Sequence, residues 1–236
     1  MLYSFTCIIK HERKKMEFSN ALRGIKKIRT SEILSLIVAV LGAVGGGLIL
    51  SAVRSAKTVE NAVSAGGGAV VGGSIVAVVA GILAIIAFIL QLIGLSAAGK
   101  DENCFRQAFI IAIIGIVVSV LQTVFAKNAL LSGVFEVISN VVSPIITYLC
   151  IGGIISIARK LGNEDMAQRG TKLVKIIIAL YVIVLIIKLL ETILGSGDVV
   201  KAISGVLAIV AGILSIVILI TYLKYLGRAV KMLEQA

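Results

Sequence analysis

A glycine-rich stretch at 65–74, AGGGAVVGGS, has the spacing of a phosphate-binding loop. From Gly67 it reads G-G-A-V-V-G-G-S, which is close to the P-loop pattern G-x-x-x-x-G-K-[ST]. A P-loop needs a preceding β-strand and a lysine that reaches the phosphates. Here Gly73 occupies the lysine position and a long uncharged apolar run follows it. The pattern therefore favours glycines that serve helix packing over glycines that bind a nucleotide.

A polar stripe within the apolar run 133–158 is the second candidate for chemistry. Its members recur at helical spacing on one face: Glu136, Asn140, Ser143, Thr147 and Cys150. The only proline of the chain, Pro144, lies beside them and predicts a kink. Such a stripe either lines a path for a small solute or forms hydrogen bonds between helices. The sequence leaves both interpretations open.

The reactive groups that enzymes use are scattered along this chain. The only histidine, His11, lies in the N-terminal tail, and no pair of carboxylates lies inside an apolar run. The three cysteines, Cys7, Cys104 and Cys150, are far apart in sequence and carry no metal-binding or disulfide spacing. We therefore expect no enzymatic activity, no metal and no cofactor.

The composition indicates a protein of the lipid bilayer. Of 236 residues, 59% are hydrophobic and 15% are charged, too few polar residues to cover a soluble domain of this size. Six apolar runs are each long enough to cross about 30 Å of hydrocarbon; they lie at 33–53, 69–97, 107–126, 133–158, 173–194 and 203–226. The predicted fold is all-α, a polytopic transmembrane bundle of about six spans, with a spanning domain at 31–227.

The charged residues predict how the chain is threaded. The tail up to Thr30, the linkers 99–107 and 159–175, and the C-terminal end carry 18 of the 23 Lys and Arg residues. The positive-inside rule then places both termini in the cytoplasm of a prokaryotic inner (plasma) membrane. Glycines follow three of the apolar runs, at Gly99, Gly162 and Gly227, as expected at helix C-termini. Together these features predict three helical hairpins in series, with 228–236 as a short cytoplasmic tail.

Small residues at every fourth position predict where helices pack. One such ridge comprises Ser35, Ala39, Ala43, Gly47 and Ser51, and the other comprises Ala65, Ala69, Gly73, Ala77 and Gly81. Small ridges allow two backbones to approach closely, so we expect the first two spans to meet along them. A shorter seam of small residues lies on the third span: Ala108, Ala112, Gly115 and Ser119.

The N-terminal region 1–30 predicts a basic segment with an amphipathic helix. The helix has an apolar face of Phe18, Leu22, Ile25 and Ile28, and its basic residues are Arg23, Lys26, Lys27 and Arg29. We expect this helix to lie on anionic lipid at the cytoplasmic face. Residues 1–15 differ in character, and Glu12–Lys15 reads like a translated ribosome-binding site. We therefore expect Met16 to be the native start.

The segment 90–118, LQLIGLSAAGKDENCFRQAFIIAIIGIVV, resembles a recurring element of a family of prokaryotic multi-pass membrane proteins of unknown function. The features that carry the resemblance are, in order along the segment, an apolar run, I-G-L, a small polar patch, D-E-N-x-F-R-x-A-x-I and I-I-G-I. It is weaker from 158 to 178. It implies a membrane protein and supplies no catalytic residues.

These observations predict a non-enzymatic membrane scaffold or interaction protein. Its partners would be the lipid bilayer and either a second copy of the chain or another membrane protein, and nucleic acid is not expected, because the basic residues flank apolar runs. The alternative is a transporter or channel for a small solute, with its path along the fourth span.

Overall fold

The computed structural model describes residues 18–55, 67–125, 129–194 and 198–236, and the side chains of 18–45, 73–125, 135, 138–139, 141–183 and 214–236. Within these ranges the chain is helical apart from short turns such as 99–102 and 161–163, as the sequence predicted. The helices are α2 (Ser19–Ser55), α4 (Gly67–Ala98), α5 (Asn103–Val124), α6 (Ala129–Lys160), α7 (Glu164–Leu194) and α8 (Asp198–Gln235). The predicted ribosome-binding-site remnant and the region before Phe18 lie outside the described residues.

Four helices in the described part of the chain are long and apolar enough to cross a membrane. These candidate spans are Ser19–Gly45, Gly73–Ala98, Asn103–Val124 and Val141–Lys160. The six-helix bundle with apolar spans confirms the predicted class of fold. An α-helix suits this environment because every backbone hydrogen bond is made within the segment.

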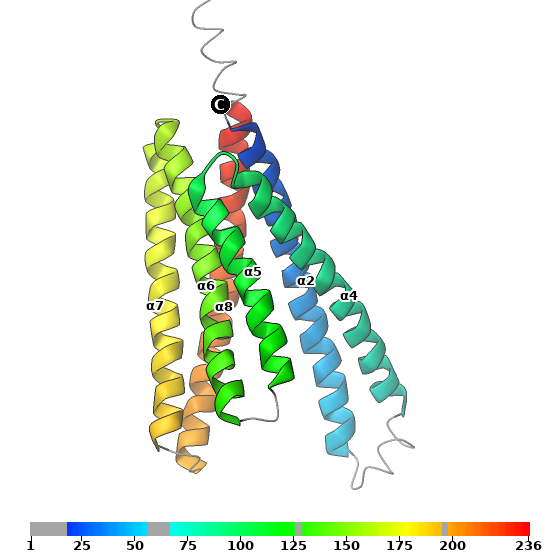
Figure 1. Cartoon of the computed structure of the whole chain (residues 1–236). Helices are drawn as coiled ribbons and strands as arrows, with labels where there is room; N and C mark the ends of the chain where they lie inside the picture. Colours follow the sequence, from blue (N-terminus) through cyan, green and yellow to red (C-terminus); the bar gives the residue numbers. More distant parts are fainter. Residues whose placement is uncertain (1–17, 56–66, 126–128, 195–197) are drawn as a thin grey trace, which may run out of the picture. The chain divides into compact units, whose positions relative to one another are not determined.

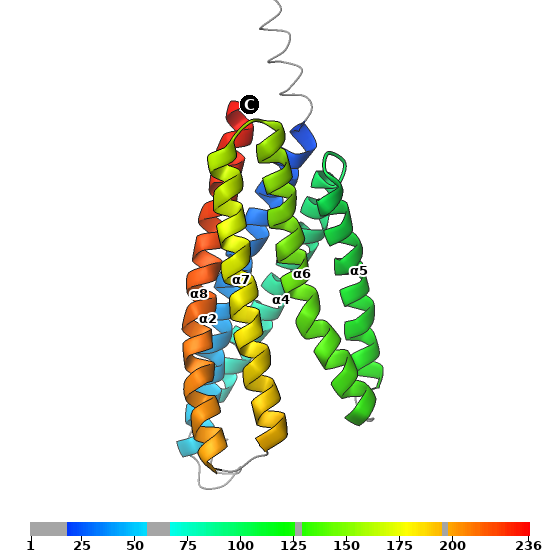
Figure 2. The same cartoon turned by 90° about the vertical axis from the view of Figure 1, so that its left-hand side faces the viewer.

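The chain divides into two compact units. One comprises the start of α2 up to Ile25 together with Leu95–Ala236, and the other comprises Lys26–Gly94. In the first unit, α5 packs on α6, α6 on α7 and α7 on α8, with a smaller contact between α6 and α8. Figures 1 and 2 show these four helices running side by side in alternating directions.

Exposed apolar side chains on α5–α8 stop at one level of the first unit. At one end of this unit lie the short linkers 99–102, between α4 and α5, and 161–163, between α6 and α7. Toward that end, the last large exposed hydrophobic residues of the four helices are Ile110, Tyr148, Ile176 and Ile220. We call these four residues the belt edge. Contacts fix their common level. A Cβ on Gly153 would lie 2.6 Å from the Phe105 ring. Gly153 lies five positions beyond Tyr148 on α6, and Phe105 lies five positions beyond Ile110 on α5.

The same level holds across α6, α7 and α8. A Cβ on Gly170 would meet Ile155 and the hydroxyl of Tyr225. Gly170 lies six positions beyond Ile176, Ile155 lies seven beyond Tyr148, and Tyr225 lies five beyond Ile220. The belt edge therefore lies at a similar level on the four helices of this unit.

Most of the buried apolar side chains of the first unit lie beyond the belt edge, in what we call the head: the described residues 18–25, 95–109, 149–175 and 221–236. Its fully buried side chains include Phe105, Leu95, Ile151, Ile154 and Leu226. The predicted spans extend into the head, and so do the candidate spans Gly73–Ala98, Asn103–Val124 and Val141–Lys160.

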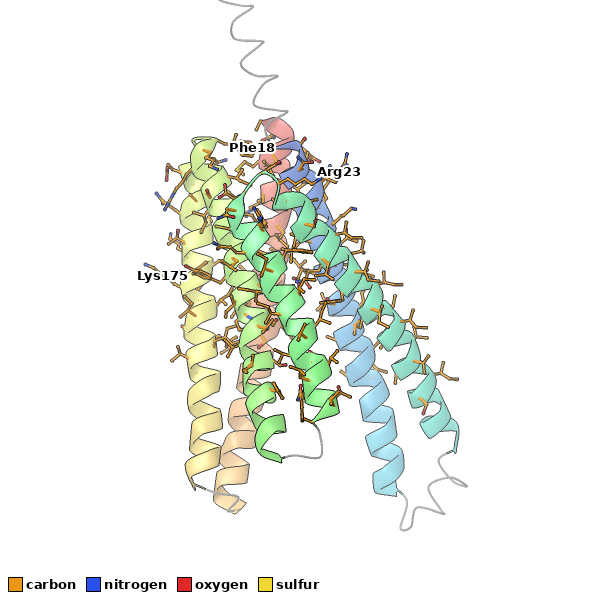
Figure 3. The ribbon with its side chains drawn as sticks, viewed as in Figure 1. Phe18, Arg23 and Lys175 are labelled. Atoms are coloured by element: carbon orange, nitrogen blue, oxygen red, sulfur yellow. The ribbon has the colours of Figure 1, made fainter. Side chains whose placement is uncertain are left out.

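The amphipathic N-terminal helix is not a separate helix on the lipid surface. Residues Ser19–Ser55 form the single helix α2, and the apolar face expected to contact lipid is buried in protein, with Phe18 at 6% exposure and Ile25 and Ile28 at 0%. Burial against other helices replaces burial in lipid. The side chains of Arg23, Lys26 and Arg29 are exposed, and Figure 3 shows Phe18 and Arg23 at the same end of α2.

The expected C-terminal tail, 228–236, is also corrected. Helix α8 continues through Gly227 to Gln235, so that glycine does not end a helix. Beyond it, one helix face is buried: Ala229, Val230, Met232 and Leu233. The apolar residues recur at helical spacing in a segment whose charges suggested a tail, and burying that face stabilises its last turns.

The other two glycines that were expected at helix C-termini, Gly99 and Gly162, differ from each other. Gly162 has a φ of +75°, and the amides of Gly162 and Asn163 donate to the carbonyls of Arg159 and Ala158. This is the Schellman pattern in which glycine ends a helix, as predicted. Gly99 has no positive φ; its added Cβ would lie 3.0 Å from the backbone of Arg106. Gly99 therefore serves close helix approach.

In the second unit, α2 and α4 contact each other through faces other than those that carry most of the predicted ridge residues. Ser35, Ala39, Ala43, Ala77 and Gly81 are all exposed, whereas Gly47, Ser51, Ala65 and Ala69 lie outside the described side chains. The described contact is made by Gly45, whose added Cβ would lie 3.1 Å from Val76 and 3.4 Å from the carbonyl oxygen of Gly73. The expectation that α2 and α4 meet is right, and Gly73 belongs to their contact.

Within the second unit, the buried small residues of α4 are spaced by seven positions instead of four. Gly73, Ala80, Ala87 and Gly94 are buried. A seven-residue repeat stays on one side of a helix that crosses its neighbour at a small angle, whereas a four-residue ridge drifts around the helix. After Gly73, the predicted four-residue ridge therefore lies on an exposed face of α4, and the buried face carries the seven-residue series.

Candidate functional site at the linker end

The polar residues of the first short linker, 99–102, join three helices of the head. The carboxylate of Asp101 accepts a hydrogen bond from Asn20 Nδ2 at 2.9 Å and another from the backbone amide of Ala21 at 2.6 Å. The carbonyl of Phe18 accepts the first bond within α2, so Phe18 occupies the N-cap position. An apolar side chain cannot accept bonds there, and Asp101 supplies the acceptor from 80 residues away.

Glu102, the neighbour of Asp101, reaches a different helix. Its carboxylate lies 2.6 Å from Nζ of Lys160 in the last turn of α6. The Glu102 side chain is 10% exposed and that of Lys160 is 52% exposed, so the ion pair lies at the rim of the head. Glu102 is also the N-cap residue of α5, but its side chain makes no capping bond there. The linker thus holds α2, α5 and α6 together through two adjacent acids.

The second short linker, 161–163, uses similar residues within its own helix. Asn163 Oδ1 accepts the backbone amide of Met166 at 3.0 Å and so caps α7. Asp165 pairs with Arg169 one turn later at 2.8 Å, and both side chains are exposed. The second linker therefore caps its own helix, whereas the first linker contacts two other helices.

Two glycines allow the aromatic side chains of the head to be buried. Phe105 is 0% exposed and its ring lies over Gly153. Tyr225 is 4% exposed and lies over Gly170. Its hydroxyl has no hydrogen-bond partner among the described residues. A side chain at either glycine would occupy the space of the ring, so the helices of the head are fixed in register by shape.

The polar stripe on the fourth span does not form one lining in the described part of the chain. Ser143 is exposed, whereas Cys150 is buried at 1%. The hydroxyl of Thr147 donates to the carbonyl of Ser143 in its own helix at 3.1 Å. Glu136 and Asn140 lie outside the described side chains. Local bonding satisfies Thr147 because the helix leaves that carbonyl accessible to it.

Reasoning from sequence identified the linkers but missed what their acids do. The D-E pair was visible as an acidic cluster, and Phe18 was visible as an apolar residue directly before a helix. An uncapped helix start and an acid at the same end of the bundle together suggest a cap in trans. Among the described residues no group of three His, Cys, Asp or Glu side chains could hold a metal ion.

Comparisons with known proteins add no relative: no protein-family model, no curated protein and no solved structure matches this chain. The geometry of the head and of the apolar belt is therefore the basis for a functional conclusion.

Proposed function

We propose that this protein is a non-enzymatic scaffold of a prokaryotic inner membrane, with both termini and the head in the cytoplasm, and that it self-associates through the face of α2 that carries Ser35, Ala39 and Ala43. The exposure of this ridge supports the proposal. Small residues on a membrane helix allow close approach of another helix. The neighbouring α4 contacts α2 elsewhere, through Gly45, and so leaves the ridge open to a second copy.

The polar groups of the head support a structural role. Asp101, Glu102 and Asn163 are engaged in contacts that cap or join helices. A side chain that acts as a general acid or base must be able to reach a substrate. These three instead hold the bundle together.

Disulfide crosslinking in native membranes tests self-association. The parent is a variant in which Cys7, Cys104 and Cys150 are replaced by Ser, and the probe is Ala39→Cys on the ridge. We expect a covalent dimer on mild oxidation. The matched control is Ile37→Cys, which is also exposed but points about 160° away around the helix. Equal crosslinking of both variants, or none at position 39, would contradict the proposed interface.

The proposed orientation has its own measurement. Reporter fusions after Asn103 and after Gly162 are expected to report cytoplasm, and a fusion within 55–63 is expected to report the opposite side. This follows from the distribution of Lys and Arg. An external signal after Gly162 would refute the three-hairpin threading and leave the crosslinking result unaffected.

A transporter or channel is the second candidate, and Ser139 on α6 favours it. The hydroxyl of Ser139 is buried without a hydrogen-bond partner among the described residues, and it adjoins the polar stripe at Asn140. Buried polar groups of this kind are commonly satisfied by water. If the stripe lines a path, Asn140→Leu and Thr147→Val will abolish solute flux in proteoliposomes while the thermal unfolding temperature is retained. Unfolding of these variants, with no flux in the parent, would favour interhelical bonding.

A further inference from the structure

Three helices of the first unit carry a basic residue at the same offset from the belt edge. Arg106 lies four positions before Ile110, Lys172 lies four before Ile176, and Lys224 lies four after Ile220. We call Arg106, Lys172 and Lys224 the basic ring. All three are exposed. Residues four apart lie on the same helix face, so each cation stands directly above an apolar residue that faces outward.

The height of the basic ring matches the headgroup layer of a bilayer. Four residues of helix rise about 6 Å, measured from the end of the exposed apolar belt. The polar headgroup region adds about 5–7 Å to each side of the hydrocarbon core. The ring therefore lies at the depth of lipid phosphates. Lys175 directly precedes the belt-edge residue Ile176. Its side chain points outward from α7 in Figure 3, so α7 carries a second exposed cation near the belt edge.

The basic ring has no protein partner in the described part of the chain. No hydrogen bond or ion pair joins Arg106, Lys172 or Lys224 to another described residue. In contrast, Lys160 and Arg169 of the head are paired with Glu102 and Asp165. All three cations of the basic ring are therefore available to a ligand.

A second set of exposed basic residues lies farther from the belt edge. Arg228 is eight positions beyond Ile220, Lys231 is eleven beyond it, and Arg159 is eleven beyond Tyr148. These rises correspond to about 12 Å and 16 Å, which is beyond the headgroup layer. We call Arg159, Arg228 and Lys231 the distal set. It has the same charge as the basic ring at a different height.

We propose that the basic ring is a binding surface for the phosphate groups of anionic phospholipids, which it holds around α5, α7 and α8. The proposal deepens the proposed function, since it names the lipid that surrounds the scaffold at its head. A phosphate at ring depth lies within reach of each cation, and guanidinium and ammonium groups form charge-assisted hydrogen bonds to phosphate oxygens. Basic residues near an anionic surface each contribute about 1 kcal/mol.

The test compares lipid binding by the full-length protein and two variants in mixed micelles. The probe is phosphatidylglycerol with a fluorescent acyl chain, competed by phosphatidylglycerol or phosphatidylcholine of the same chain length. The ring variant is R106Q/K172Q/K224Q and the distal variant is R159Q/R228Q/K231Q; both lose three positive charges and both retain Lys175. We expect the ring variant to lose about five-fold in preference for phosphatidylglycerol per residue, and the distal variant to stay within two-fold of wild type.

Three controls make each outcome decisive. The charge-conserving variant R106K/K172R/K224R is expected to keep the preference, which separates loss of charge from loss of fold. Inorganic phosphate at millimolar concentration is expected not to compete, and competition by it would overturn the lipid assignment in favour of a free-phosphate site. Equal loss in both glutamine variants, or no preference in wild type, would also overturn the proposal. Crosslinking at position 39 and the reporter fusions are independent of all these results.

Discussion

Replacing Asp101 with alanine removes a helix cap that the chain supplies from 80 residues away. The substitution deletes both bonds accepted by the carboxylate, from Asn20 Nδ2 and from the backbone amide of Ala21. Loss of a capping side chain costs about 0.5–2 kcal/mol, and a carboxylate at a helix N-terminus contributes about 0.3–1 kcal/mol through the helix dipole. We therefore expect Asp101→Ala to lower the free energy of unfolding by about 2 kcal/mol.

Thermal unfolding in detergent measures this effect. For a chain of this size 1 kcal/mol corresponds to about 2–4 °C, so Asp101→Ala is expected to lower Tm by about 4–8 °C. The control is Asp165→Ala, which removes an exposed pair with Arg169 within one helix; such pairs contribute about 0.3–0.5 kcal/mol. In the double variant with Asn20→Ala, the two losses are expected to be less than additive. A Tm for Asp101→Ala within 1 °C of wild type would refute the cap in trans.

Three further predictions concern packing. Gly153→Ala is expected to lower the free energy of unfolding by about 1–3 kcal/mol through overpacking, because its Cβ would lie 2.6 Å from a buried aromatic ring of α5. The control is Gly152→Ala, whose Cβ meets nothing within 4 Å. Equal Tm values for the two variants would contradict the register of α5 and α6. Gly45→Leu is expected to lower Tm and Gly42→Leu to leave it unchanged, because an added Cβ meets α4 only at the first position; the reverse order would refute the described contact. Truncation after Gly227 removes four buried apolar side chains. Three of them, Val230, Met232 and Leu233, each contribute up to about 1.5–3 kcal/mol. The truncation is therefore expected to prevent stable folding, whereas removal of the last two residues is expected to leave Tm within 2 °C. A stable truncated protein would show that 228–236 is a tail after all.

The class of fold and the helices could be predicted because they follow from signals within each segment. Long uncharged runs indicate membrane helices whatever they pack against, and Gly162 ends α6 with the local backbone geometry that its position after an apolar run suggested. Of the seam predicted on the third span, Ala108 and Ala112 are buried, whereas Ser119 is exposed. In each of these cases the sequence near the residue carries the whole reason for its structure.

The candidate site was harder to predict because it depends on contacts between distant segments. Asp101 and Ala21 come together only when the start of α2 packs on the first linker. The ridges of the second unit failed for a related reason: both four-residue and seven-residue series of small residues pass through Gly73, and only the crossing of two helices decides which one is buried. The crossing angle between two helices cannot be predicted from the helix propensity or the residue spacing of either helix alone.

Burial is uneven along the helices of the first unit. Lipid gives no hydrophobic driving force for helix association, and on α5–α8 most of the large side chains in the belt face outward. In the head, apolar residues such as Ile151, Ile154 and Leu226 are fully buried. Burial in the head therefore fixes the register of the four helices, and the same register brings Arg106, Lys172 and Lys224 to one height. The packing of the head thus stabilises this unit and sets the level at which the proposed lipid-binding cations lie.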